Sequence, residues 1–189
     1  MRVTYFKSSF LDIFIFICLK NGNGTLEGVV LDEIKFFWKE DDVISYIEKN
    51  NLEQVDEKLL EDQGVVSDLF NLINEYLSGK RINLYDKIKN LNIDLSFSKK
   101  FGTSFSQKVM EIVSKLNYGE TTTYSSIGQK INSKAYRAIG SILRKNPIPL
   151  VIPCHRVLGR NGIGGFMGET DGGKEINLKK ALLKLEGVV

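Results

Sequence analysis

The residues best suited to chemistry in this sequence lie together in one short segment, residues 146–157, which reads NPIPLVIPCHRV. The segment contains all three prolines of the 189-residue chain, its only histidine (His155) and one of its two cysteines (Cys154). Each proline fixes a φ angle and removes a backbone donor, and the apolar residues between them can anchor the segment in a core. The pattern therefore indicates a thiol on stiff, well-packed backbone, as a preorganised reaction site requires.

A thiol next to an imidazole suggests nucleophilic chemistry. Free cysteine has a pKa near 8.5, so only about 3% is thiolate at pH 7, and a reactive cysteine needs a base or a positive local field. His155 is the only imidazole available, and Arg156 adds positive charge nearby. Adjacent side chains of an extended segment point in opposite directions, so direct contact between Cys154 and His155 is not assured, and a bridging water or a sharp turn could connect them. The alternative is that Cys154 is a small core residue with a polar neighbour, but the flanking prolines and following glycines favour reactivity.

A glycine-dense stretch, GGFMG at residues 164–168, follows the thiol. It suits a loop whose backbone comes close to a ligand, and the chain has no P-loop motif for binding phosphate. Phe166 and Met167 can line an apolar pocket for a planar group. Packing of both side chains onto the core is an equally consistent alternative.

The second half of the chain predicts helices that must position these residues. Ser104 is a candidate N-cap for the first helix and Thr123 for the second. The predicted ranges are 104–116, 124–131, 134–145 and 174–186.

The second and third of these helices form a helix-turn-helix candidate, because Asn132-Ser133 separates them. One apolar stripe runs along the third helix, made of Ala135, Ala138, Ile139, Ile142 and Leu143. Polar and basic residues lie off this stripe, among them Lys134, Arg137, Ser141 and Arg144. Both DNA binding and an ordinary basic solvent face fit this pattern, and the small residues suit close approach to another surface or close internal packing.

The first half of the chain predicts strands followed by helices. The expected strands are residues 3–6, 10–19 and 26–30, with 34–38 as a further candidate, and the expected helices are 41–49 and 65–77. Asn21–Gly24 is a strong hairpin signal, and residues 78–100 are expected to cross to the second half. The apolar run at 10–19 is too short to span a bilayer and contains Asp12, so a buried strand is favoured over a targeting segment.

Charge is divided unevenly along the chain. Residues 1–98 carry 17 acidic and 11 basic side chains, a net charge of −6, whereas residues 99–189 carry 6 acidic and 15 basic ones, a net charge of +9. The division predicts two domains, 1–98 and 99–189, of which the second faces a polyanion. Simple attraction between the two halves is the alternative. Both cysteines are expected to be free thiols in a reducing cytoplasm.

The motifs together resemble a known family. IPCHRV after NPIP, preceded by YRAIGSILRKNP, is similar to the O6-alkylguanine-DNA alkyltransferases over residues 101–187. The resemblance implies an α+β (α/β) fold, with an N-terminal RNase H-like α/β domain and a mostly helical, winged-helix-like DNA-binding domain that carries the cysteine. It implies direct-reversal DNA repair, in which Cys154 takes an alkyl group from O6 of guanine in double-stranded DNA once and irreversibly. O4 of thymine is a second candidate donor.

The resemblance also implies roles in the reaction for five residues. Cys154 accepts the alkyl group, His155 deprotonates it through a bound water, and Glu186 holds His155. Tyr124 gives a proton or hydrogen bond to the departing base, and Asn146 braces the turn before the active-site segment.

Two further sets of residues follow from the resemblance. For DNA binding, Arg137 enters the duplex in place of the flipped guanine, and small residues allow close approach in the minor groove. This set is Lys134, Ala135, Arg137, Ala138, Ser141 and Arg144. The implied substrate pocket consists of Arg156, Val157, Phe166, Met167 and Gly168.

The sequence departs from the family pattern at three points. Met167 stands where many relatives have a small hydroxyl residue, and Phe166 replaces a common tyrosine. Some relatives bind zinc in the N-terminal domain, but residues 1–98 contain no histidine and only Cys18, so no metal site is expected. The interpretation requires no cofactor and no membrane, and it places a monomer in the cytoplasm.

Two other classes of function remain open. One is a DNA-binding regulator, or a protein that flags alkylated DNA without transfer chemistry, against which the presence of Cys154 argues. The other is a cysteine hydrolase that uses Cys154, His155 and Glu186, which would need an oxyanion hole and would turn over repeatedly.

Overall fold

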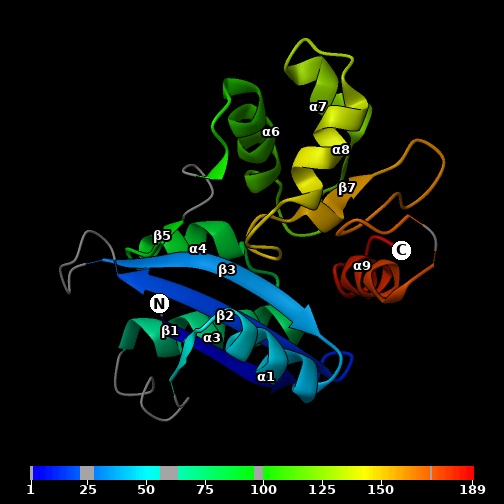
Figure 1. Ribbon diagram of the computed structural model, residues 1–189. Helices are drawn as coiled ribbons and strands as arrows, with labels where there is room; N and C mark the ends of the chain where they lie inside the picture. The colour runs from blue at the N-terminus through cyan, green and yellow to red at the C-terminus, as the bar shows by residue number, and fades with distance from the viewer. Residues whose placement is uncertain (1, 22–27, 56–63, 96–99, 171) are drawn as a thin grey trace. The chain divides into compact units, whose positions relative to one another are not determined.

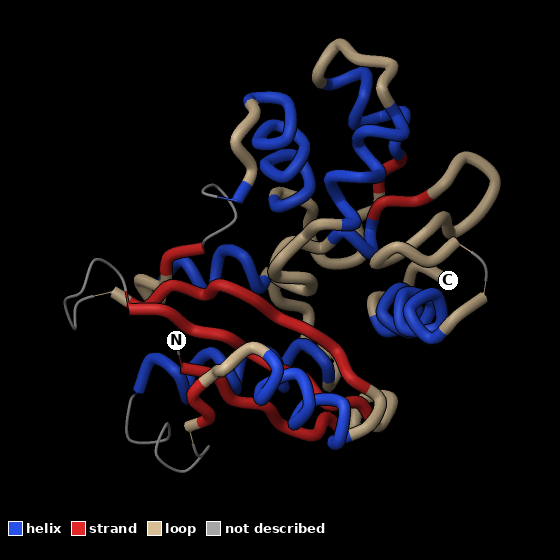
Figure 2. The backbone as a smooth tube through the Cα atoms, in the orientation of Figure 1, coloured by secondary structure: helices blue, strands red, loops and turns tan. Residues whose placement is uncertain are grey.

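The structure is a computed structural model that describes residues 2–21, 28–55, 64–95, 100–170 and 172–189. The chain has an α+β fold and divides into two compact units, Met1–Ser96 and Phe97–Val189. The long strands lie in the first unit, whereas the second consists mainly of helices and loops (Figure 2). Within the described ranges, no helix is long and apolar enough to cross a membrane.

A sheet of five strands, counted over the described residues, forms the centre of the first unit (Figure 1). The strands are β1 (Arg2–Ser8), β2 (Ile13–Asn21), β3 (Val29–Phe37), β4 (Glu53–Gln54) and β5 (Asp94–Leu95), in the order β4-β1-β2-β3-β5. The three long strands pair antiparallel, and the short edge strands pair parallel with β1 and β3. Isoleucine, phenylalanine and valine dominate the long strands because branched and aromatic side chains pack well on a pleated surface.

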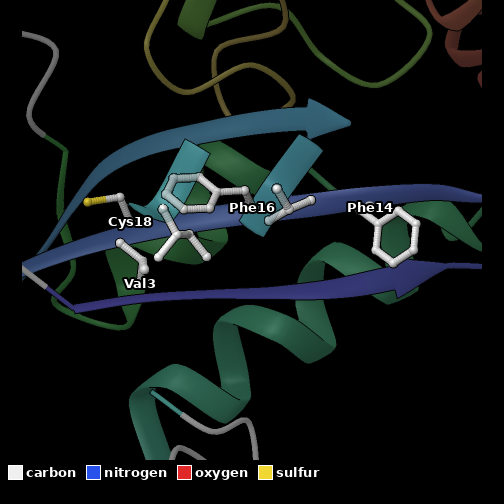
Figure 3. Packing of buried hydrophobic residues seen from close by; sticks show 6 residues of the cluster. Val3, Phe14, Phe16 and Cys18 are labelled. Carbon is white, nitrogen blue, oxygen red and sulfur yellow. The ribbon is translucent and has the colours of Figure 1, made fainter. Parts of the chain in front are cut away.

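Helices cover both faces of this sheet. Helix α1 (Glu40–Lys49) packs on the face that carries Phe16, whose ring makes edge contacts with Phe37 and Tyr46 at centroid distances of 6.3 and 5.3 Å. Figure 3 shows Val3, Phe14, Phe16 and Cys18 of this cluster. Helix α3 (Gly64–Leu77) covers the other face, and α4 (Leu84–Asn90) contacts α3. Alternate side chains of β2 point to opposite faces of the sheet. Because helices cover both faces, the side chains on both must be apolar, which explains the continuous apolar run in the sequence.

Three sequence predictions for this unit require comment. Residues 29–37 form one strand where the sequence suggested separate strands at 26–30 and 34–38. The segment 78–100, expected only to cross between domains, contains α4 and β5, and α4 is capped by Asn83, whose side chain accepts a hydrogen bond from the Asp86 N–H. The hairpin turn expected at residues 21–24 lies outside the described residues after Asn21.

The second unit is built from helices and one small sheet. The helices are α6 (Ser104–Ser114), α7 (Tyr124–Lys130), α8 (Tyr136–Arg144) and α9 (Lys174–Leu185), and the short 3₁₀ turn η1 spans Cys154–Arg156. Strands β6 (Thr122–Thr123) and β7 (Val157–Leu158) pair in parallel. Because β6 leads directly into α7 and β7 directly follows η1, this pairing brings the start of α7 to the turn that carries the thiol.

Side-chain caps begin α6 and α7 but not α8 and α9, and two details differ from prediction. Thr103 rather than Ser104 caps α6, and its Oγ1 accepts a hydrogen bond from the Ser106 N–H at 3.1 Å. Thr123 caps α7 as predicted. Helix α8 begins at Tyr136 rather than Lys134, because residues 131–135 form the turn between α7 and α8.

The predicted apolar stripe of α8 is wrong for two residues. Ala135 and Ala138 are exposed, whereas Ile139 and Leu143 are buried, and α8 contacts α6 and α7. The buried face of α8 is therefore narrow, and the two alanines lie on its exposed face together with the basic residues. Small side chains on an exposed helix face leave its backbone open to a second surface.

The packing of Phe16 should dominate the stability of the first unit. Phe16→Ala removes a ring that is 0% exposed, and it should lower the free energy of unfolding by about 3–5 kcal/mol. Urea unfolding followed by the fluorescence of Trp38, the only tryptophan, measures this change. Ile44→Ala on α1 is the control, because its side chain is 41% exposed and its loss should cost less than about 0.5 kcal/mol. Similar unfolding midpoints for the two variants would contradict the assignment.

Candidate active site

Cys154 lies at the start of a tight turn and not on an extended strand. The turn η1 is closed by hydrogen bonds from the Arg156 N–H to the Pro153 carbonyl at 2.9 Å and from the Val157 N–H to the Cys154 carbonyl. Cys154 and His155 are both buried, with 6% and 0% of their surface exposed. The sharp turn that the sequence left open as one route between thiol and imidazole is therefore present.

Asn146 ties the thiol to the segment that precedes it. Its Nδ2 donates to the Ile152 carbonyl at 2.8 Å and to Cys154 Sγ at 3.2 Å, and its Oδ1 accepts from the Ile148 N–H at 3.2 Å. These hydrogen bonds connect the beginning of the proline-rich segment to its end, as expected of a residue that braces the turn. The direct contact with sulfur adds a donor that stabilises a thiolate more than a thiol.

The carboxylate of Glu186, at the end of α9, is the centre of the hydrogen bonding behind the thiol. It accepts from Arg156 Nε at 2.9 Å and Nη2 at 2.7 Å, from His155 Nε2 at 3.1 Å, and from the Gly119 N–H at 3.2 Å. Arg156 Nη1 also donates to the Leu116 carbonyl at 2.7 Å. Glu186 thus joins α9, η1 and the turn after α6 in one buried cluster.

Burial and charge act on the two partners of this cluster in defined directions. The pKa of His155 is lowered, chiefly because burial disfavours the imidazolium, although Glu186 opposes the shift. The pKa of Glu186 is also lowered: burial alone would raise it, but hydrogen bonds and charge from His155 and Arg156 outweigh burial. At neutral pH the cluster therefore contains a carboxylate, a guanidinium and a neutral imidazole, and a neutral imidazole can accept a proton.

The thiol and the nearby phenol are both held in their neutral forms at rest. Burial raises the pKa of Cys154, while the hydrogen bond from Asn146 and the charge of Lys179 oppose that shift. Burial, with a smaller contribution from Cys154, raises the pKa of Tyr124. Cys154 consequently needs help to ionise, and Tyr124 remains a proton donor.

A cleft of about 460 Å³ opens onto the thiol. Its walls come from α7, α8, η1 and the glycine-rich loop. The sequence-predicted residues that line it are Tyr124, Arg137, Ser141, Arg144, Cys154, Phe166, Met167 and Gly168. Phe166 is 4% exposed, so it forms a packed apolar wall as well as part of the lining.

The remaining predicted residues lie outside the lining. Asn146, His155, Arg156, Val157 and Glu186 lie behind the thiol and support it. Lys134, Ala135 and Ala138 are exposed at the start of α8, next to the lining residue Arg137. The structure thus separates a buried supporting group from an exposed helix face, with the cleft between them.

Two glycines allow the walls of the cleft to approach each other. A Cβ at Gly164 would lie 3.4 Å from the Tyr124 ring and 2.8 Å from the Gly159 nitrogen, and its φ of +75° also disfavours other residues. A Cβ at Gly168 would lie 2.7 Å from Arg144 Nε, and its φ is +102°. Met167, with a φ of 49°, is the non-glycine residue of this turn in the left-handed region, so its side chain is presented from strained backbone.

Lys179 is a residue of this site that sequence analysis missed. It lies on the packed side of α9 with 0% of its surface exposed, and its Nζ donates to the carbonyls of Val157 at 2.7 Å and Gly165 at 3.0 Å. The sequence gave only a weak indication that Lys179 is buried. Lys179 follows the apolar residue Leu178 in an amphipathic helix, but Lys180, which follows Leu178 almost as closely, is exposed. The described residues contain no group of three or more histidine, cysteine or acidic side chains able to hold a metal ion.

Comparison with known proteins places this site in context. Residues 104–188 match the family described as 6-O-methylguanine DNA methyltransferase, DNA binding domain. The chain is 36% identical to a methylated-DNA–protein-cysteine methyltransferase of Sulfolobus acidocaldarius over 132 residues, covering 70% of this chain and 74% of that protein. It is also 36% identical over 116 residues to the protein of the same name from Archaeoglobus fulgidus, covering 61% and 71%.

Solved structures show the same likeness over nearly the whole chain. The O6-methylguanine methyltransferase of Mycobacterium tuberculosis matches with a TM-score of 0.63 and 26% identity, covering 98% of this chain and 92% of that one. The O6-methylguanine-DNA methyltransferase of Pyrococcus kodakaraensis shares the fold, with a TM-score of 0.64, 23% identity and 99% of both chains covered. The predicted α+β fold is thereby confirmed.

Acid should weaken the second unit. Because folding lowers the pKa of both His155 and Glu186, the unfolded chain binds protons that the folded chain does not. Their stabilisation is complete above the unfolded histidine value of about 6.5 and is lost as the pH falls, first through His155 and then, below about 4.3, through Glu186. Hydrogen exchange of the α9 amides, corrected for intrinsic rates, should show protection falling by up to about tenfold per pH unit below 6.5. Unchanged protection between pH 7.5 and 4.5 would contradict the assignment.

Proposed function

The chain belongs to the methylated-DNA–protein-cysteine methyltransferase family, and we propose on this premise that it repairs DNA by moving an alkyl group from O6 of guanine to Cys154. The observation that carries the proposal is the position of Cys154, at a cleft with an imidazole–carboxylate pair behind it and the basic face of α8 beside it. A thiol so placed can reach a base only if that base leaves its stack.

The proposed reaction is a single displacement. The proton of Cys154 passes to the neutral imidazole of His155 through a bridging water, with Glu186 stabilising the imidazolium that forms. The sulfur then forms a bond to the alkyl carbon while the bond from that carbon to O6 breaks. The departing guanine takes a proton from Tyr124, whose raised pKa keeps it protonated. The phenolate regains a proton from His155 or solvent, which closes the proton balance.

The product explains why one protein molecule would act once. A thioether has no ionisable proton, and its alkyl group would leave only if a strong nucleophile displaced the Cys154 thiolate, so the alkylated protein would be a stable end product. The reaction requires no cofactor, because the alkyl donor is the damaged base and the acceptor is the protein. Stoichiometric repair of this kind distinguishes the proposal from hydrolysis, which would regenerate the thiol.

The exposed face of α8 supports binding to double-stranded DNA. Arg137 and Arg144 lie both on this face and at the cleft, and Lys134 is exposed at its start. Ala135 and Ala138 let the helix backbone approach the floor of a minor groove, where a weak base code does not matter to a protein that scans any sequence. Arg137 would occupy the space left by the flipped guanine, and phosphate contacts would supply affinity independent of sequence.

The pocket walls bear on the range of adducts. Phe166 and Met167 offer apolar, polarisable contacts to a purine and its alkyl group, and the backbone of Cys154 and Val157 would read the guanine edge. Met167 supplies no hydroxyl to O6, so a backbone N–H would take that role. O4-alkylthymine would be a second substrate, and the protein would act as a monomer in the cytoplasm.

Transfer should be limited to one alkyl group per protein molecule, located on Cys154. Intact-mass measurement after incubation with an excess of O6-methylguanine oligonucleotide should show one added methyl group, and peptide mapping should place it on Cys154 and not on buried Cys18. Cys154→Ala should show no added mass but should still bind the oligonucleotide. Turnover beyond one equivalent would indicate a hydrolase, and binding without transfer in the unsubstituted protein would indicate a flagging protein or regulator.

Arg137 should matter for duplex DNA and not for the chemistry itself. Arg137→Ala should slow transfer from an O6-methylguanine duplex by about tenfold or more, because the flipped state loses the side chain that fills the vacated stack. Transfer from free O6-benzylguanine should change little. Arg160→Ala, an exposed arginine in the turn after β7, is the matched control for loss of one positive charge. Equal slowing of both reactions by Arg137→Ala would contradict the proposed role.

A further inference from the structure

Lys179 is a buried ammonium without a carboxylate beside it. None of its surface is exposed, and both hydrogen bonds of its Nζ go to backbone carbonyls, those of Val157 and Gly165. Over the described part of the chain, no acidic oxygen lies within 4.0 Å of this nitrogen. Burial of an unpaired charge is expensive, and the pKa of Lys179 is lowered to about 8 by desolvation. Buried charged groups with a strongly shifted pKa are more common at functional sites than elsewhere in protein cores.

The two carbonyls connect Lys179 to both sides of the cleft. Val157 directly follows the turn η1, and its N–H donates to the Cys154 carbonyl. Gly165 belongs to the glycine-rich loop and lines the cleft with Phe166. Lys179 therefore holds the thiol turn and the pocket loop together from behind, and its removal would free both.

The charge of Lys179 also acts on the thiol. Lys179 lowers the pKa of Cys154, and an ionised Cys154 in turn raises the pKa of Lys179, as the reciprocity of linked sites requires. His155 feels the same charge, which lowers its pKa.

The other charged and titratable groups around the thiol leave Lys179 without a paired anion in the described part of the chain. Arg156 and Glu186 pair with each other, and His155 is neutral at pH 7. Tyr124, which faces the thiol from α7, is also neutral. The glycine-rich loop also carries Glu169, whose Oε2 is buried next to Gly173 and forms no ion pair with Lys179. A thiolate at Cys154 would add a negative charge that interacts with the ammonium of Lys179.

We propose that Lys179 is a positioning residue of the transfer reaction: its ammonium clamps the thiol turn to the pocket loop and supplies the countercharge for the Cys154 thiolate. This role rests on the proposed function, since it concerns the ionisation of the sulfur that accepts the alkyl group. It adds to the imidazole–carboxylate pair, because His155 moves the proton whereas Lys179 stabilises the charge that the proton leaves behind.

The test compares Lys179→Met, which removes the charge at similar length, with Lys179→Arg, which keeps it. Lys180→Met is the matched control, because Lys180 is the exposed neighbour on α9. The rate of Cys154 alkylation by iodoacetamide is followed from pH 7 to pH 11, with peptide mass spectrometry to separate Cys154 from Cys18. The same proteins are tested for transfer from free O6-benzylguanine at pH 7.

Lys179→Met should raise the pH midpoint of Cys154 alkylation by about one unit and slow transfer about tenfold. Lys179→Arg and Lys180→Met should keep the midpoint of the unsubstituted protein. A folded Lys179→Met variant with an unchanged midpoint would overturn the proposal, since a purely structural lysine would lower stability without moving the thiol. If the unsubstituted protein transfers no alkyl group, the proposed function fails, while the iodoacetamide profile still decides the role of Lys179.

A measurement on the unsubstituted protein covers the case in which Lys179→Met does not fold. The ¹³Cε resonance of Lys179, assigned by its loss in Lys179→Arg, is titrated before and after Cys154 is alkylated. Because alkylation removes the thiolate, the midpoint of Lys179 should fall. An identical titration in both states would overturn the proposal.

Discussion

The buried carboxylate of Glu186 is the interaction on which the site depends. It accepts hydrogen bonds from Arg156, His155 and the Gly119 backbone, and so it joins the last helix, the thiol turn and the turn after α6. A buried ion pair contributes little net stability, but it is very costly to break, because the partner left behind is an unpaired charge in the core. Any other arrangement of these side chains would leave a buried charge unpaired, and this cost favours a single position of the His155 imidazole near Cys154.

The thiol itself is placed in an environment that opposes its own reaction. Burial keeps Cys154 neutral and excludes water that would compete for an electrophile, yet displacement requires a thiolate. The surrounding groups offset this conflict in three ways: a donor from Asn146, a neutral base in His155, and the nearby charge of Lys179. Each of these acts on the ionised sulfur more strongly than on the thiol, which is how preorganised polar groups contribute to a reaction.

The exposed face of α8, in the same unit, contributes little to packing and is open to a partner. Helix α8 buries Ile139 and Leu143 and leaves Ala135, Arg137 and Ala138 to solvent, a composition that contributes little to packing. An exposed face of alanine and arginine suits a charged, closely approaching partner better than it suits water. The cleft lies between the two sides, so a base that enters from the helix face meets the sulfur in front of its buried support.

The sequence alone identified the family and much of the fold. The rarest residues fall in one rigid segment, strands precede helices, and PCHRV with the closing LEG indicates the family and the residues at its site, because local motifs and residue periodicity are written directly in the chain. Tertiary structure decided what depends on packing between distant segments. Examples are the exposure of Ala135 and Ala138, α4 within residues 78–100, the turn at Cys154, and the pairing of Arg156 with Glu186. The burial of Lys179 belongs to the same group, since an amphipathic helix does not reveal which of two adjacent lysines faces the core until the core is assembled.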